Sequence, residues 1–382
     1  MRPIYLDNNA AAPLAPEALA AMTQTAQEAY GNPSSLHRMG VKASRILEDA
    51  RACLARYLGA DPREVVFTSG ATESVNMALL GAAKALRRQG NRILTSAVEH
   101  ESTLAVCKHL QSEGRLIDML ETDAFGRICP DRLAAAVRND TILAAFGHVN
   151  GELGTIHPIA EFAQIVKQKN PRVVFFSDGA QAFGKMPVHA RSVDLYAASA
   201  HKLHGPRGIG ALVVRGAPIK PLLFGGGQER GLRPGTENAP AAAGFAAAVE
   251  AAYQDMPAWR ERLRKLRQRF LEAIAPIGNV RVNSPNDALE TTVNAAFIGV
   301  PAETLSHALE ERGVYVSTGS ACSSAKRSVS SVLAALPIPE AARRSSLRFS
   351  FSRCTTENCI DGAAAALRET VPKLRQLYKL AQ

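Results

Sequence analysis

Short β-rich runs alternate with helical patterns through the first 260 residues, and this alternation is the strongest constraint on the fold. EVVFTSG, at residues 64–70, predicts a strand ending in a glycine turn, and the ATESVNMALL that follows predicts a helix. Further strands are expected in NRILTSAVEH, TILAAFGHVN, RVVFFSDGAQ, DLYAASAHK and GIGALVVR. Strands interleaved with helices indicate an α/β fold with a mostly parallel sheet covered on both faces.

The pattern changes after about residue 258. A long basic helix is expected over residues 259–275, followed by short strands, a helix, a further strand in SLRFSFS and a closing helix. This mixture predicts a smaller α+β domain. We therefore expect a large domain at 15–258 and a small C-terminal domain at 259–382, with residues 1–14 joining the small domain.

The cysteines and the apolar stretches limit the class of protein. Six cysteines without a C-x-x-C pair argue against a disulfide scaffold or zinc module, and no metal site is expected. The N-terminal residues hold Asp7 and two asparagines where a signal peptide needs an apolar run, and the Ala-rich stretch interrupted by Glu250 is too short for a membrane span. We expect a soluble, cytoplasmic protein that does not bind membranes.

The net charge of +10 comes from scattered basic residues, with the densest clusters at 260–269 and 341–353. The first cluster has helical character, which favours a solvated amphipathic face over docking of an acidic protein. Nucleic-acid binding is not expected. Five cysteines are interpreted as small buried hydrophobes: Cys53, Cys107, Cys129, Cys354 and Cys359.

Polar residues follow the predicted strands, where ligands of parallel sheets usually bind. They fall at Thr68–Thr72, His100, Asn150, Asp178–Gln181 and Ser199–Lys202. Each has an ordinary structural explanation, as a surface charge, a turn residue or a core histidine. Common nucleotide and hydrolase motifs such as G-x-x-x-x-G-K-[ST] and G-x-S-x-G are absent from the sequence.

Taken together, these residues meet the requirements of pyridoxal 5′-phosphate (PLP). The cofactor needs a lysine amine, an anion beside its pyridine nitrogen, a helix N-terminus for its phosphate and a flat ring against its own. Lys202, Asp178, Ala71–Thr72 and His100 could meet these needs in that order. The residues alone leave both the PLP site and the ordinary explanations open.

Ten motifs in order extend the argument over nearly the whole chain. They are YLDNNAAAPLAPEAL, YGNPSSLHRMG, VVFTSGATESVNMAL, VEHESTL, HVNGELGTIHPI, SDGAQAFGK, SAHKLHGPRGIGAL, GGGQERGLRPGTEN, STGSACSS and SLRFSFSRCTTE. With this set the chain resembles the NifS/IscS-type cysteine desulfurases of the class V aminotransferase family. The resemblance implies a PLP-dependent transferase of fold type I, with a mostly parallel mixed sheet in the large domain and a smaller α+β C-terminal domain.

The resemblance also implies roles for individual residues. Lys202 carries the covalent link to PLP, His100 stacks on the ring and moves protons, and Cys322 is the nucleophile. The substrate carboxylate is bound by Arg348, a task that suits its planar, bidentate guanidinium. The remaining cofactor contacts are implied for Ala71, Thr72, Ser199, His201 and, across a homodimer, Thr236 at the phosphate, and for Asp178 and Gln181 at the ring.

The leading hypothesis for the function is conversion of L-cysteine to L-alanine. The sulfur would pass to Cys322 as a persulfide and then to an acceptor protein for iron–sulfur or thio-cofactor synthesis. The small, polar loop STGSACSS suits a thiol that must travel between cofactor and acceptor. The alternatives are a selenocysteine lyase or cystine C–S lyase on the same scaffold, and a non-catalytic paralogue.

One departure from the family pattern falls close to the expected site. The family usually carries HVNNE, whereas this chain carries HVNGE, with Gly151 at the second asparagine. Asn150 or a water is expected to replace the missing donor, and one lost hydrogen bond corresponds to roughly 1 kcal/mol.

Overall fold

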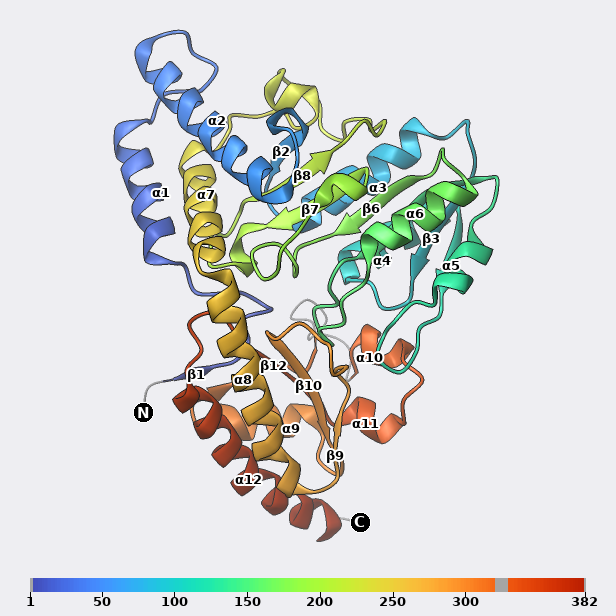
Figure 1. Cartoon of the computed structure of the whole chain (residues 1–382), viewed down its shortest axis with the longest axis vertical. Coiled ribbons are helices and arrows are strands. Elements are labelled where there is room, and N and C mark those ends of the chain that lie inside the picture. Colours follow the sequence, from blue (N-terminus) through green and yellow to red (C-terminus); the bar gives the residue numbers. More distant parts are fainter. Residues whose placement is uncertain (1–2, 320–328, 381–382) are drawn as a thin grey trace.

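The computed structural model describes residues 3–319 and 329–380. Its larger part is a seven-stranded sheet (Figure 1). The strands lie in the order β2 (Val65–Thr68), β8 (Gly210–Val214), β7 (Leu195–Ser199), β6 (Val174–Asp178), β5 (Thr141–Gly147), β3 (Arg92–Ser96) and β4 (Leu116–Leu120). Only β8 runs antiparallel to its neighbours, β2 and β7. The expected mostly parallel mixed sheet is therefore confirmed.

Both faces of this sheet are buried, because successive side chains of a strand point to opposite faces. Phe175 on β6 belongs to one core and Phe176 to the other. The first core is completed by α1 (Pro16–Glu28), α2 (Arg38–Leu58), α5 (Pro130–Ala136), α6 (Ile159–Lys169) and α7 (Ala239–Gln254), and the second by α3 (Ala71–Ala85) and α4 (Glu101–Ser112). This two-sided burial explains why the strands read as continuous apolar runs.

A second, antiparallel sheet follows in the chain, in the order β12 (Ser346–Ser350), β10 (Thr292–Phe297) and β9 (Val280–Val282). It packs with α8 (Met256–Ile274), α9 (Ala302–Glu310) and α12 (Glu357–Leu380), and Leu6 enters the same core. The N-terminal β1 (Ile4–Tyr5) pairs in parallel with β11 (Val314–Tyr315). Two short helices, α10 (Ser331–Ala335) and α11 (Glu340–Arg344), lie on the side facing the large sheet (Figure 1).

The expected basic helix is α8, and half of its six basic side chains form ion pairs. Arg260 and Arg264 both contact Glu290, and Arg269 forms a two-pronged pair with Asp361. These ion pairs leave α8 much less cationic than its sequence suggests. In the part of the chain described by the structure, no helix is both long and apolar enough to cross a bilayer.

The interpretation of the spare cysteines as buried hydrophobes is right for Cys107 and wrong for Cys129 and Cys354, which are exposed. Cys129 precedes Pro130 at the start of α5, and Cys354 lies in the turn before α12. Turns that begin a surface helix expose their side chains whatever the residue type.

Candidate active site

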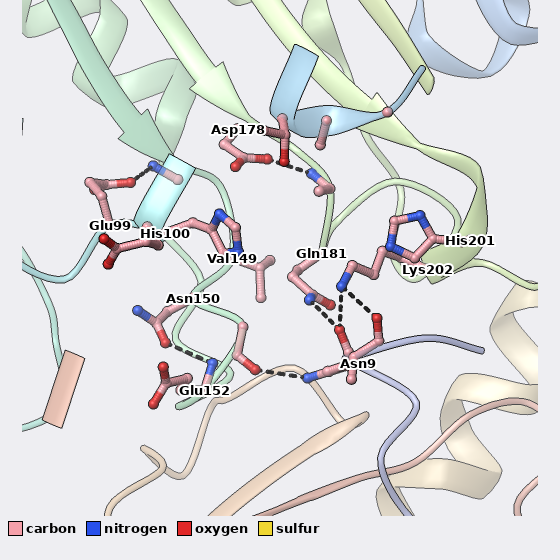
Figure 2. Close-up of a pocket in the computed structure, with 18 of the residues that line it drawn as sticks. Asn9, Glu99, His100, Val149, Asn150, Glu152, Asp178, Gln181, His201 and Lys202 are labelled. Atoms are coloured by element: carbon pink, nitrogen blue, oxygen red, sulfur yellow. Dashed lines mark hydrogen bonds between the residues drawn. The ribbon is translucent and has the colours of Figure 1, made fainter. Parts of the chain in front are cut away.

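A pocket of about 490 Å³ opens beyond the carboxyl ends of β5, β6 and β7. The N-terminal turns of α3 and α4 form one part of its wall, and Arg348 on β12 with Ser331 and Val332 on α10 forms another. Residues far apart in sequence therefore meet where the large and small sheets face each other. Figure 2 shows Lys202 and His201 on one side of this pocket, with His100, Asn150 and Glu152 on the other.

Lys202 ends the short 3-10 turn (Ala200–Lys202) that follows β7. Its Nζ donates to the backbone oxygens of Asn9, at 2.7 Å, and Ala10, at 2.9 Å. These contacts hold the amine at the pocket floor and tie it to the N-terminal segment.

Asp178 is the last residue of β6 and is almost fully buried. Its Oδ1 accepts the backbone N–H of Ala180 at 3.0 Å, which fixes the carboxylate at the pocket's inner end (Figure 2). Gln181 follows on the same turn, with its Nε2 3.0 Å from the backbone oxygen of Asn9. The pair offers one carboxylate and one amide to a ring lying in the pocket.

The N-terminus of α3 lines the same pocket, with Ser69, Gly70, Ala71 and Thr72. Gly70 precedes the helix and supplies no side-chain cap, so the first N–H groups of α3 remain available to an anion. β8 passes so close that a Cβ on Gly210 would lie 2.6 Å from Gly70 Cα. Glycine at position 210 is what lets this turn sit against the sheet.

His201 lies opposite this turn and contacts Ser199 through Nδ1 and Oγ at 2.9 Å. Burial, reinforced by the Lys202 charge, lowers the pKa of His201 to about 4. The ring is therefore neutral near pH 7. If Nδ1 accepts the Ser199 hydroxyl proton, Nε2 carries the ring proton and can donate it to an anion.

His100 is the N-cap of α4, and its Nδ1 accepts the Ser102 backbone N–H at 3.2 Å. This bond orients the imidazole into the pocket, where Figure 2 shows it beside Val149. The strand-to-helix connection β3–α4 thus supplies a flat ring on the opposite side of the pocket from Lys202.

Asn150 also lines the pocket, but its amide is used by the backbone around it. Its Oδ1 accepts from the Glu152 and Leu153 N–H groups, and its Nδ2 donates to Val98 O at 2.9 Å. These bonds shape the turn after β5, which leaves Asn150 little capacity to replace the donor missing at position 151.

Gly151 itself lies against Gln181. A Cβ at this position would meet Gln181 Nε2 at 3.1 Å and Cγ at 3.2 Å, tighter than ordinary contact. Its backbone oxygen accepts from Asn9 Nδ2 at 3.0 Å and from Arg348 Nη1 at 3.3 Å. The glycine therefore allows the Gln181 amide to lie directly over the backbone.

Arg348 projects from β12 into the pocket, and its side chain is only 3% exposed. Its Nη2 lies 2.6 Å from Asp7 Oδ1, whereas its Nε has no hydrogen-bond partner among the described residues. A buried guanidinium that lines a pocket is suited to bind a small carboxylate.

Two predicted site residues, Thr236 and Ser199, are absent from the pocket lining, and Ser199 is buried and bonded to His201. Thr236 is exposed. Cys322 lies outside the described residues. Three residues that the sequence analysis missed also belong to the site or its support: Asn9, Glu99 and Lys185. All three lie within quoted motifs, but their residue types alone do not reveal these roles, which depend on neighbours far away in the chain.

Glu99 is buried beside His100, where Ser96 Oγ donates to its Oε1 and the Gly147 N–H donates to its Oε2. Burial raises the pKa of Glu99 to about 7. For a carboxyl group shifted upward, the stability contribution is complete below the unfolded pKa and is lost as the pH rises through the folded one.

We expect Glu99→Gln to remove this pH dependence, because the amide can donate to Ser96 and still accept from Gly147. Between pH 5 and 8, the free energy of unfolding of the unmodified protein should fall by about 2–3 kcal/mol relative to Glu99→Gln. Urea denaturation of the cofactor-free proteins at several pH values measures the difference. Glu303→Gln, at an exposed position, is the matched control; parallel profiles for Glu99→Gln and unmodified protein would contradict the prediction.

The residues present fit PLP on structural grounds. A lysine amine, a buried carboxylate, an uncapped helix N-terminus with a neutral histidine beside it, and a buried arginine all line one pocket. Each group matches one part of the cofactor or of an amino-acid substrate.

Comparison with known proteins agrees with this geometry. The family model described as Aminotransferase class-V matches residues 4–362. A curated protein named cysteine desulfurase IscS, from Methanosarcina thermophila, is 39% identical over 381 residues, covering 99% of this chain and 94% of that protein.

Two solved structures are similar over most of their length. A NifS-like protein superimposes with a TM-score of 0.92 at 34% identity, covering 97% of this chain and all of the other. SspA in complex with cysteine gives a TM-score of 0.81 at 34% identity, covering 92% of this chain and 99% of that one. The chain belongs to the PLP-dependent class-V aminotransferase family, among its NifS/IscS-type members.

Proposed function

We propose that this protein is a PLP-dependent cysteine desulfurase, which converts L-cysteine to L-alanine. The observation that carries the proposal is the convergence of Lys202, Asp178, His100 and Arg348 on one pocket from four separate elements. The cysteine desulfurases among its relatives, and the cysteine bound in the SspA structure, support L-cysteine as the substrate.

When bound, PLP supplies an aldehyde that links to amines and a ring that withdraws electrons from the substrate Cα. Lys202 would hold the cofactor covalently and move protons at the substrate. Asp178 would keep the pyridine nitrogen protonated, and Gln181 would donate to the ring oxygen. The phosphate would lie at Ala71 and Thr72, with His201 donating to it and Ser199 orienting the His201 ring, and His100 would cover the ring face.

Arg348 would bind the substrate carboxylate in the pocket that Asn150 also lines. We expect Arg348→Ala to lower kcat/KM for L-cysteine by about 30- to 150-fold, mostly through KM, since truncating one member of a buried charged pair costs 2 kcal/mol or more. Steady-state kinetics measure this effect. Arg344→Ala, at an exposed site on α11, is the control, and an unchanged KM in Arg348→Ala would reject the assignment.

We further propose that the substrate sulfur passes to Cys322. The substrate C–S bond breaks as an S–S bond forms, so that L-cysteine and the Cys322 thiol yield L-alanine and a Cys322 persulfide. An acceptor protein of iron–sulfur or thio-cofactor synthesis then takes the sulfur. The free thiols of the described cysteines support a reducing, cytoplasmic setting.

A homodimer is part of the proposal. Thr236 would reach the phosphate of the partner's cofactor, which its exposure on the loop before α7 permits. Leu36 and Phe224, exposed by 97% and 80%, are unusual for a free surface and support burial against a second copy. We place the boundary between large and small domains near residue 258, in the first turn of α8.

The direct test is incubation of the purified protein with L-cysteine and measurement of alanine and sulfide. Alanine formation by the PLP-bound protein supports a desulfurase, and its complete absence rejects the proposal. Parallel rates on selenocysteine and cystine separate the two lyase alternatives. A paralogue without catalytic function would retain PLP yet show no spectral response to any of these amino acids.

A further inference from the structure

Lys185 is a buried lysine next to the pocket, four residues after Gln181 in the turns that follow β6. Its exposed fraction is 6%, and no carboxylate pairs with it within residues 3–319 and 329–380. Burial, together with the Lys202 and Arg348 charges, places the pKa of Lys185 well below its usual value. Burying an amine that has no carboxylate partner costs folding free energy, so we expect Lys185 to have a role in the site.

The amine contacts two side-chain amides. Its Nζ lies 2.6 Å from Gln181 Oε1 and 2.8 Å from Asn9 Oδ1. A lysine amine donates N–H bonds in both its charged and its neutral form, so these contacts do not depend on its protonation state. Each amide therefore turns its oxygen toward Lys185 and its nitrogen away.

For Gln181, the orientation of the amide decides whether its N–H or its oxygen faces the pocket. With Oε1 held by Lys185, Nε2 points toward Asn9 O, at 3.0 Å, and toward the pocket beside Gly151. The two ends of a glutamine amide have nearly the same shape, so a neighbouring group must determine which end is presented. A flipped amide would place an acceptor where the ring oxygen of PLP, also an acceptor, would lie.

Asn9 links the same lysine to the rest of the site. Its Nδ2 donates to Gly151 O and to Thr292 Oγ1 at 2.8 Å, and its backbone oxygen accepts from Lys202. One buried amine thus sets both amides that surround the Lys202 end of the pocket.

We propose that Lys185 is a positioning residue, which fixes the Gln181 amide so that its N–H, and not its oxygen, faces the ring oxygen of bound PLP. This inference rests on the proposed function, because it takes the ring oxygen to lie near Gln181.

The test compares Lys185→Met with Gln181→Leu and with the double variant. Methionine approximates the length of lysine but removes every donor. Loss of one hydrogen bond is expected to weaken PLP binding by about 5-fold, and the absorption maximum of bound PLP should move in the same direction in both single variants. The double variant should match Gln181→Leu, since Lys185 acts through Gln181.

PLP titration of the cofactor-free proteins and the absorption spectrum of each loaded protein give these values. Lys373→Met, on the exposed face of α12, is the control for the chemical change and should behave as the unmodified protein. A Lys185→Met protein that loses only thermal stability, with its band and PLP affinity unchanged, would overturn the inference. So would effects of the two single variants that multiply in the double variant, or a Gln181→Leu protein with an unmoved band.

Lys185→Gln provides a milder variant if Lys185→Met does not fold. Its shorter side chain retains a donor, so its band and affinity should fall between those of unmodified protein and Gln181→Leu, whereas values equal to the unmodified protein would count against the inference. Unmodified protein that binds no PLP or forms no alanine would reject the proposed function. The positioning role is judged only by comparing variants with PLP-bound protein, so the two failures are distinguishable.

Discussion

Replacing Lys202 by alanine is expected to lower alanine formation from L-cysteine by about 1,000-fold or more. The variant loses both the covalent link to PLP and the amine that moves protons at the substrate. No other described lysine lines the pocket, and the buried Lys185 is held by Gln181 and Asn9. Borohydride reduction followed by mass spectrometry should add PLP to the peptide containing residue 202 in the unmodified protein only.

The pocket should still bind PLP without the covalent bond, through the α3 N-terminus, Asp178 and His201. Noncovalent PLP in Lys202→Ala would show that the remaining site is intact and that the lost rate is chemical. Lys373→Ala serves as the exposed control. An activity above about one tenth of the unmodified protein in Lys202→Ala would be incompatible with the proposed role.

Cys322→Ala is expected to reduce sulfur transfer to an acceptor protein by about 1,000-fold or more, because it removes the nucleophile. The described residues on either side support a thiol near the pocket. A Cβ on Gly319 would lie 2.9 Å from Ser330 Cβ, and Ser330 Oγ donates to Glu152, which lines the pocket.

The measurement uses ³⁵S-labelled L-cysteine and follows label on the protein and on an acceptor. Unmodified protein should carry label on the peptide containing residue 322, and Cys322→Ala should carry none while its PLP spectrum still responds to cysteine. Cys129→Ala and Cys354→Ala control for adventitious labelling, because both thiols are exposed. Full transfer by Cys322→Ala would place the sulfur relay elsewhere.

Several parts of the fold followed directly from residue patterns. The strand at β6 was predictable because RVVFFSD is a short apolar run that ends in a charge, and α3 because a glycine turn precedes an apolar helical repeat. β4 was not predicted, since its residues are largely exposed at the sheet edge and lack a clear apolar run. The antiparallel direction of β8 could not be predicted from the sequence either, because strand direction depends on the path of the chain between strands.

The residues of the site also divide into those that the sequence revealed and those that it did not. Lys202, Asp178, His100 and Arg348 were found because each carries chemistry in a recognisable segment, and the structure brings all four to one pocket. Glu99 and Lys185 were missed, because a single buried charge leaves no periodic signal and its meaning depends on its partners. The contacts of Asn150 were also unexpected, since the amide serves the turn in which it lies.

The sequence by itself determined the α/β alternation, the family and the set of side chains available for PLP chemistry, because these depend on residue type and local spacing. Only the tertiary structure decided the pairing of Arg348 with Asp7, the neutral state of His201 and the contacts of Lys185 with two amides. Hydrogen bonds act over about 3 Å and burial depends on every neighbour, so both are set by folding residues hundreds of positions apart into contact.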